Sequence, residues 1–221
     1  MKVCTDACIF GSWIAKILTE QNQQILNALD IGTGTGLLSL MPAQKTTLKI
    51  DAIEVEENAF NQAKENFKNS PWKERLHIFH ADVKQFDPSK KYDLIISNPP
   101  FFENDLLSHH QHKNIAKHSE SLTLQELIQI VNQHLSINGY FAVLLPYHRI
   151  EYFKNLAEEN NFFLKEELLI KQTPAHNFFR GALIFIRSKS EKATHQLTIK
   201  SSEGEYTPEF KGLLKDYYLH L

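Results

Sequence analysis

Short apolar segments alternate along this chain with amphipathic segments, and this alternation limits the possible folds more than any other feature of the sequence. Five apolar segments have the length and composition of buried strands: residues 25–31, 48–55, 76–80, 92–97 and 139–145. Three amphipathic segments are predicted to be helices: residues 57–67, 124–135 and 150–160. Strands that alternate with helices favour an α/β fold with a mostly parallel sheet, covered by helices on both faces.

The pattern changes after residue 160. Residues 162–171 and 182–188 both resemble strands, and no long helix lies between them. They predict an antiparallel pair at one edge of the sheet. Residues 7–19 and 208–221 are expected to form a first and a last helix. The 221 residues together suit one domain of ordinary size.

The composition excludes several classes of protein. No apolar run approaches the roughly 18 residues that cross a membrane, and residues 1–15 lack the pattern of a signal peptide, so a cytoplasmic location is expected. Cys4 and Cys8 are too few for a disulfide framework and are expected to be free thiols rather than metal ligands. The formal net charge is −2, so any binding to nucleic acid must use a local basic patch.

A glycine-rich loop directly follows the first predicted strand. Gly32, Gly34 and Gly36 allow a sharp turn and let a ligand approach the backbone closely. The dinucleotide-binding pattern would need its third glycine at position 37, where this chain has leucine. Asp30, just before the loop, would repel a pyrophosphate but attract the cationic amino acid end of S-adenosylmethionine. A ligand site is therefore favoured over a plain structural turn.

Acidic residues also end the next two predicted strands. Glu54 is placed to accept hydrogen bonds from both ribose hydroxyls of a bound nucleoside. Asp82 is placed to accept a hydrogen bond from an adenine amino group, although a cap of a helix or turn is an equal alternative. With Asp30, these residues put one carboxylate at each of three successive strand ends. The ordered set predicts a cofactor site more specifically than any one member does.

The segment Asn98-Pro99-Pro100-Phe101 follows the predicted strand at residues 92–97 and carries the most chemical information. The prolines restrict the backbone, and Pro99 keeps Asn98 out of the helical region. The Asn98 side-chain oxygen and the Pro99 carbonyl would each accept one hydrogen of a ring-conjugated amino group, which aims the nitrogen lone pair at a methyl donor. Phe101 would stack on the ring. A proline-rich turn without function is the alternative.

These motifs resemble those of the tRNA(Val) adenine-N6 methyltransferase family. The resemblance is carried by KVCTDA at residues 2–7, LDIGTGTG at residues 29–36, IEVEENA at residues 53–59, SNPPFF at residues 97–102 and YTPEF at residues 206–210. It implies a Rossmann-like class I methyltransferase, with a seven-stranded, mostly parallel sheet and an antiparallel edge hairpin, in one domain over residues 1–221. It also implies S-adenosylmethionine as cofactor and methylation of N6 on the adenine 3′ of the anticodon in a valine tRNA.

The resemblance has implications for the amino-terminal part of the chain. Thr5 and Asp6 would lie near the cofactor, as would Asn98, and residues 1–24 would form a helical lid. Family members usually carry a further segment before the Met-Lys-Val start, rich in Phe, Lys and Gln. Either the start is shorter here or an upstream part is missing.

A long polar loop at residues 102–119 is predicted to contact the substrate, because long loops beside a site often do so. Lys113 and Lys117 in this loop, and Arg149 and Arg180 elsewhere, are predicted to meet RNA phosphate. An ordinary solvated surface is the alternative for each of them. The histidines of the loop match no standard metal site, so no metal is expected.

The NPPF motif does not choose the substrate, because DNA adenine and protein glutamine methyltransferases share it. Protein glutamine, or another nucleobase in rRNA or DNA, remains open as the target. A non-catalytic RNA-binding module on the same fold is a further alternative, which the intact motif disfavours. The sequence implies neither a membrane nor a stable protein partner.

Overall fold

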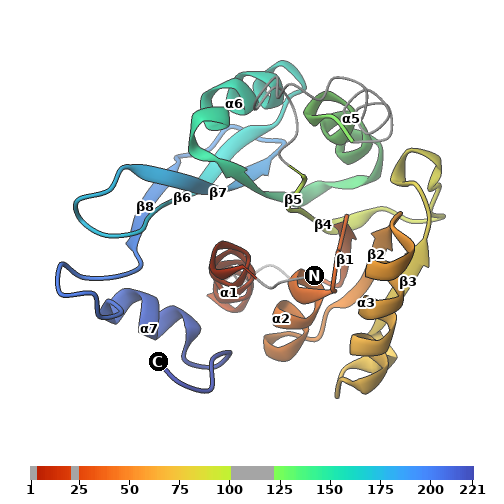
Figure 1. The fold of residues 1–221 in the computed structure, drawn as a ribbon. Helices are drawn as coiled ribbons and strands as arrows, with labels where there is room; N and C mark the ends of the chain where they lie inside the picture. The colour runs from red at the N-terminus through yellow and green to blue at the C-terminus, as the bar shows by residue number, and fades with distance from the viewer. Residues whose placement is uncertain (1–3, 21–24, 101–121) are drawn as a thin grey trace, which may run out of the picture.

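The computed structural model describes residues 4–20, 25–100 and 122–221, which form a mixed sheet covered by helices (Figure 1). The strands are β1 (Asn27–Ile31), β2 (Lys49–Glu54), β3 (Leu76–His80), β4 (Tyr92–Ser97), β5 (Leu135–Pro146), β6 (Phe163–Lys171), β7 (Phe178–Ile186) and β8 (Ala193–Thr198). The α-helices are α1 (Thr5–Glu20), α2 (Leu37–Lys45), α3 (Glu57–Asn69), α5 (Leu124–His134), α6 (Ile150–Glu159) and α7 (Pro208–Leu214). Three short 3₁₀ helices are η1 (Lys73–Arg75), η2 (Val83–Gln85) and η3 (Tyr147–Arg149). No helix in these ranges is long and apolar enough to span a bilayer.

The strand order β3-β2-β1-β4-β5-β7-β6-β8 confirms the predicted mostly parallel sheet. The first five strands in this order run parallel. Ile31 at the end of β1 lies beside Ile53 of β2 on one side and Ser97 of β4 on the other. The carboxyl ends of these strands are therefore level, and the chain order reverses between β1 and β4. In open α/β sheets a crevice at such a reversal is where ligands bind.

Both faces of the sheet are buried, which explains why strands such as β5 are almost continuously apolar. On one face, Tyr140 and Ala142 of β5 belong to the same core as side chains from α1, α2 and α7. On the other face, Phe141 and Val143 share a core with side chains from α5 and α6. Figure 1 shows the two layers, with α5 and α6 above the sheet and α1, α2, α3 and α7 below it.

The sheet has eight strands in the described residues, and not the seven that were predicted. The additional strand, β8, runs parallel to β6 and forms the edge, so the antiparallel pair of β6 and β7 lies inside the sheet. Five of the strands, β1 to β4 and β6, were predicted within two residues at both ends. In contrast, β8 was missed, and it has only Leu197 buried among its six residues. A strand with a single buried side chain lacks the apolar alternation that identifies strands from sequence.

Helix α2 was also missed. It contains Pro42, and proline inside a segment argues against a helix because the ring removes a hydrogen-bond donor and clashes with the preceding turn. Here the proline lies near the middle of a nine-residue helix that packs against α1. Tertiary packing therefore overrides the local preference.

The core around β5 predicts a large difference between two of its residues. Phe141 is fully buried, and its ring contacts those of Phe153, Phe162 and Phe185, whereas Ile137 on the same strand is 75% exposed. Phe141→Ala is expected to lower the free energy of unfolding by about 3–5 kcal/mol. Ile137→Ala, the matched control, is expected to change it by less than about 0.5 kcal/mol. Urea denaturation measures both, and equal effects would contradict the assigned core.

Candidate active site

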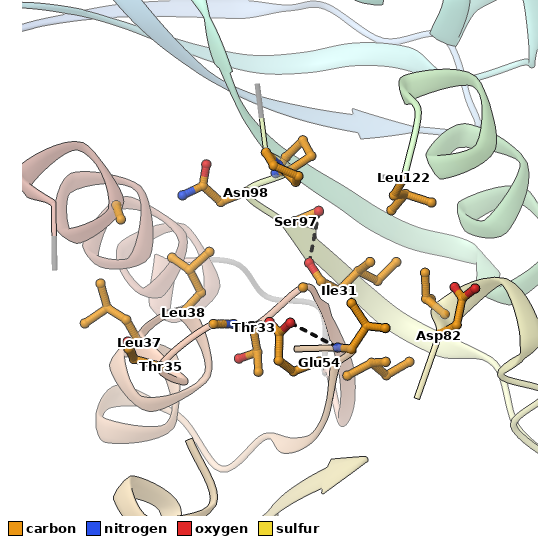
Figure 2. Close-up of a pocket in the computed structure, with 18 of the residues that line it drawn as sticks. Ile31, Thr33, Thr35, Leu37, Leu38, Glu54, Asp82, Ser97, Asn98 and Leu122 are labelled. Atoms are coloured by element: carbon orange, nitrogen blue, oxygen red, sulfur yellow. Dashed lines mark hydrogen bonds between the residues drawn. The ribbon is translucent and has the colours of Figure 1, made fainter. Parts of the chain in front are cut away.

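A cavity of about 450 Å³ opens at the carboxyl ends of β1, β2, β3 and β4, and its volume lies in the range usual for small-molecule sites. Figure 2 shows the side chains that line it, drawn from the turns after these strands and from the start of α2. The cavity brings together the following residues that the sequence had singled out: Gly32, Gly34, Glu54, Asp82, Asn98, Pro99 and Pro100.

The glycine loop has the backbone conformation that requires glycine. Gly32, Gly34 and Gly36 have φ angles of 69°, 59° and 84°, in the left-handed region. The loop is bound to the end of β2, because the N–H groups of Gly32 and Thr33 both donate to the Ile53 carbonyl at 3.0 Å. Gly36 does not line the cavity. A Cβ atom there would lie 2.4 Å from the Phe67 ring, so this glycine allows the loop to pack against α3.

Asp30 is fully buried behind the glycine loop and does not itself line the cavity. One carboxylate oxygen, Oδ2, accepts hydrogen bonds from the Thr33 hydroxyl at 2.6 Å and the Ser39 hydroxyl at 2.7 Å. The other, Oδ1, is buried and has no partner among the described residues. Burial raises the pKa of Asp30 to about 6, against the lowering effect of the two hydroxyls. A positive charge in the nearby cavity would stabilise the ionised form.

Glu54 is held rigidly in the cavity wall. Its Oε2 accepts from the Gly34 N–H at 2.8 Å, which Figure 2 marks with a dashed line. Its Oε1 accepts from the N–H groups of Val55 and Glu56 at 3.0 and 2.9 Å. A carboxylate offers about four acceptor positions, so capacity remains for a ligand hydroxyl. The backbone thus orients a carboxylate without neutralising it.

Asp82 lies on the far side of the cavity from Asn98 in Figure 2. Its side chain caps η2 by accepting a hydrogen bond from the Lys84 N–H at 2.9 Å, so the structural role considered from sequence is present. The same residue lines the cavity, beside apolar side chains that include Val55 and Leu122. Val55 is 62% exposed and leaves an apolar face available to a planar ligand. The contact of Asp82 with adenine stays a prediction.

The turn after β4 presents an acceptor that the described residues leave unpaired. The Ser97 hydroxyl donates to the Ile31 carbonyl at 3.1 Å and ties the end of β4 to β1 (Figure 2). Asn98 follows directly and lines the cavity with Pro99 and Pro100. Its side-chain oxygen Oδ1 is buried without a hydrogen-bond donor in the part of the chain that the structure describes. Because an unmet buried acceptor is costly, this position suits the N–H of a ligand.

The amino-terminal end of α1 contributes to the cavity through other residues than those predicted. Cys4 and Ala7 line the cavity, whereas Thr5 and Asp6 do not. Asp6 instead pairs with Arg180 at 2.9 Å, which ties the start of α1 to the start of β7. Sequence reasoning missed the two lining residues, because a cysteine and an alanine carry no chemical signature of a binding site. Their only signal was their place in the KVCTDA segment.

The predicted substrate contacts are only partly within the described residues. Phe101 and the loop at residues 102–119, with Lys113 and Lys117, lie outside them. Arg149 ends η3, and its guanidinium lies over the Tyr152 ring, 4.8 Å from the centroid. The roles of these residues toward RNA stay predictions.

Comparisons with known proteins find methyltransferases. A family model described as "Methyltransferase small domain" matches residues 11–164. A tRNA1(Val) (adenine(37)-N6)-methyltransferase from Flavobacterium psychrophilum is 38% identical over 224 residues, covering 100% of this chain and 94% of the relative. A protein of the same name from Dyadobacter fermentans is 40% identical and covers 99% of this chain and 91% of the relative. A solved structure described as a predicted O-methyltransferase from Agrobacterium tumefaciens has a TM-score of 0.73 at 16% identity, with 95% of each chain covered, so it shares the fold.

The burial of Asp30 predicts a specific dependence of stability on pH. Its pKa is raised from the ordinary 3.8 to about 6, so the folded protein favours the protonated carboxyl. The resulting contribution to the free energy of unfolding is fully present below pH 4 and is lost as the pH rises through 6. Asp30→Asn cannot titrate. The unfolding free energy of the wild type relative to this variant is therefore expected to fall by about 2–3 kcal/mol from pH 4 to pH 7. Urea denaturation of both proteins at four pH values measures the difference. A constant difference would mean that Asp30 titrates normally.

Proposed function

Because the chain belongs to the tRNA1(Val) (adenine(37)-N6)-methyltransferase family and matches the methyltransferase small domain, we propose that it methylates N6 of adenine 37, the adenine 3′ of the anticodon, in a valine tRNA. The observation that carries this proposal is the buried, unpaired Oδ1 of Asn98 at the cavity wall. An acceptor in this position suits an amino group, and the exocyclic nitrogen of adenine is such a group.

The residues around the cavity fit S-adenosylmethionine, the cofactor of this enzyme class. Glu54 has acceptor capacity left for ribose hydroxyls, and its orientation is set by three backbone N–H groups. Asp82 and the exposed face of Val55 suit an adenine ring, which needs one hydrogen-bond acceptor and an apolar surface. The amino acid end would lie at Gly32 and Gly34, where the buried charge of Asp30 behind the loop favours a cation.

S-adenosylmethionine supplies a methyl group that is already activated on a positively charged sulfur, so the reaction needs no strong base. The protein's task is to hold the acceptor nitrogen, whose lone pair is otherwise delocalised into the purine ring. Asn98 Oδ1 and the Pro99 carbonyl would each accept one amino hydrogen, which favours a pyramidal nitrogen and stabilises the charge that develops on it. While the bound cofactor supplied its methyl group to the nitrogen lone pair, Asn98 Oδ1 and the Pro99 carbonyl would keep the amino group in place, and the nitrogen would then release one proton to water.

Other contacts with the tRNA follow from the same assignment. Phe101 would stack on the target base, and four basic residues would meet phosphates: Lys113, Lys117, Arg149 and Arg180. Because the net charge of the chain is −2, these contacts should be few and sensitive to salt. A tRNA substrate also agrees with the cytoplasmic location expected from the sequence.

Product analysis tests the reaction. The wild-type protein is incubated with S-adenosylmethionine carrying a tritiated methyl group and, in separate reactions, with bulk RNA, DNA or protein. We expect label only in RNA, and in N6-methyladenosine after digestion to nucleosides. Adenine 37 is then tested with a valine tRNA in which another base replaces this adenine, which should abolish labelling. Label in protein glutamine, or in DNA alone, would contradict the proposal.

Substitution of Asn98 tests the mechanism. Asn98→Ala removes the acceptor and is expected to lower kcat by about 10²–10³-fold, since groups that stabilise developing charge contribute roughly this much. Affinity for S-adenosylmethionine, measured by calorimetry, is expected to change little. Asn98→Asp keeps an acceptor oxygen and should retain more activity than the alanine variant. Loss of cofactor binding in Asn98→Ala would show instead that Asn98 holds the cofactor.

A further inference from the structure

A second group of side chains lies at the same end of the strands as the cavity, but none of them lines the cavity. It consists of Tyr147, Arg149, Tyr152, Lys171 and Phe178, and we call it the aromatic–basic surface. The residues come from η3, the first turn of α6, the end of β6 and the start of β7. Three aromatic rings and two cations therefore gather from segments that are separated in the sequence.

The strand register places this surface next to the turn after β4. Ser97 at the end of β4 lies beside Val143 of β5. Three residues further along each chain come Pro100, which lines the cavity, and Pro146, which ends β5. Tyr147 follows Pro146 directly, so the surface begins just after the strand that neighbours β4, at the same end of the sheet as the Asn98–Pro100 turn. A polymer whose reacting unit entered the cavity at this turn would pass over the surface with its neighbouring units.

The contacts within the surface pair rings with rings and with cations. The rings of Tyr147 and Phe178 are 5.5 Å apart between centroids, at 41°. The Lys171 ammonium lies 5.7 Å from the centroid of Phe178, and Phe178 and Lys171 are partners in the β6–β7 ladder. On the other side, the Arg149 guanidinium lies over Tyr152. These pairs hold the rings in place before any ligand binds.

Exposure separates this surface from a core. Tyr147 is 44% exposed and Tyr152 is 45% exposed, although burial of such large rings is favourable. Glu151, next to Tyr152, pairs with Lys154 at 3.0 Å, and Lys154 also pairs with the buried Glu167 at 2.7 Å. Arg149 and Lys171 bring two cationic side chains to this surface, each close to an aromatic ring, in a protein whose net charge is −2. Exposed rings interleaved with cations are the combination that binds single-stranded nucleic acid, by stacking bases and contacting phosphates.

We propose that the aromatic–basic surface stacks the unpaired nucleotides that flank the target adenine and thereby positions the RNA loop over the cavity. This inference rests on the proposed function, because it takes the target base to lie in a single-stranded loop. The rings of Tyr147, Tyr152 and Phe178 supply the stacking face, and the cations of Arg149 and Lys171 contact phosphate. These residues bind and position the substrate, and none of them takes part in the methyl transfer itself.

The test measures affinity apart from catalysis. A fluorescently labelled anticodon stem-loop of a valine tRNA, and a blunt RNA duplex of equal length, are titrated with wild-type protein and with Tyr147→Ala. The variant is expected to bind the stem-loop roughly ten-fold more weakly and the duplex unchanged, because only the loop offers bases for stacking. Tyr147→Phe keeps the ring and should bind as the wild type does. Tyr152→Ala, at a separate exposed position, gives a second measurement if Tyr147→Ala folds poorly.

Phe163→Ala is the matched control. Phe163 begins β6 and therefore lies at the other end of the strands from the cavity. The Lys189 ammonium lies 5.2 Å from the centroid of its ring. Phe163 thus repeats the pairing of Phe178 with Lys171 at a position away from the cavity. Its substitution should leave the affinity for the stem-loop unchanged. Arg149→Gln should lower the dependence of log Kd on log salt by about one unit, as expected for one phosphate contact.

The outcomes separate this inference from the proposed function. If folded Tyr147→Ala and Tyr152→Ala bind the stem-loop like the wild type, or lose affinity for the duplex equally, the stacking surface is wrong, whatever the wild type methylates. If both variants lose affinity for the loop while the wild type makes no N6-methyladenosine, the proposed reaction fails and the RNA-binding surface stands. Weaker binding by Phe163→Ala of the same size would also overturn the inference.

Discussion

The hydrogen bonds at the end of β1 position everything else in the cavity. The strand lies between β2 and β4, and its last residue is level with both neighbours. Just past these strand ends, the Ile53 carbonyl accepts hydrogen bonds from the two N–H groups that start the glycine loop. The Ser97 hydroxyl donates to the Ile31 carbonyl. The loop and the turn after β4 therefore cannot shift independently. Rigid placement of this kind is what a reaction between two bound molecules requires.

Electrostatics within this frame follow from how each polar group is solvated. Glu54 has its charge surrounded by three N–H groups and needs little else. Asp30 and Asn98 each keep one buried oxygen that accepts no hydrogen bond from the described residues. Asn98 lines the cavity, and Asp30 lies behind the glycine loop. A bound cation and a bound amino group would meet these two needs. The unfavourable burial of the two oxygens is the physical cost of a site prepared before its ligands arrive.

The antiparallel part of the sheet carries the aromatic–basic surface, which we propose binds the substrate. Because β7 is antiparallel to β5 and β6, β7 starts at the end of the sheet where β5 and β6 finish. That geometry brings the aromatic–basic surface to the end of the sheet that also carries the Asn98–Pro100 turn. It also lets Arg180 at the start of β7 bind Asp6 at the start of α1, so the cavity wall formed by α1 is tied to the substrate side of the sheet. In this proposal, methyl transfer and RNA binding use separate side chains at the same end of the sheet.

The amino-acid sequence alone determined the mostly parallel sheet, the glycine loop and the turn at Asn98, because these depend on local apolar runs and on residues with restricted backbones. It could not determine β8 or α2, since their formation depends on neighbours rather than on their own residues. The pairing of Asp6 with Arg180, and the wall formed by Cys4 and Ala7, also needed the tertiary structure. These contacts join residues far apart in the chain, and only the packing of α1 against the sheet decides which side chains meet.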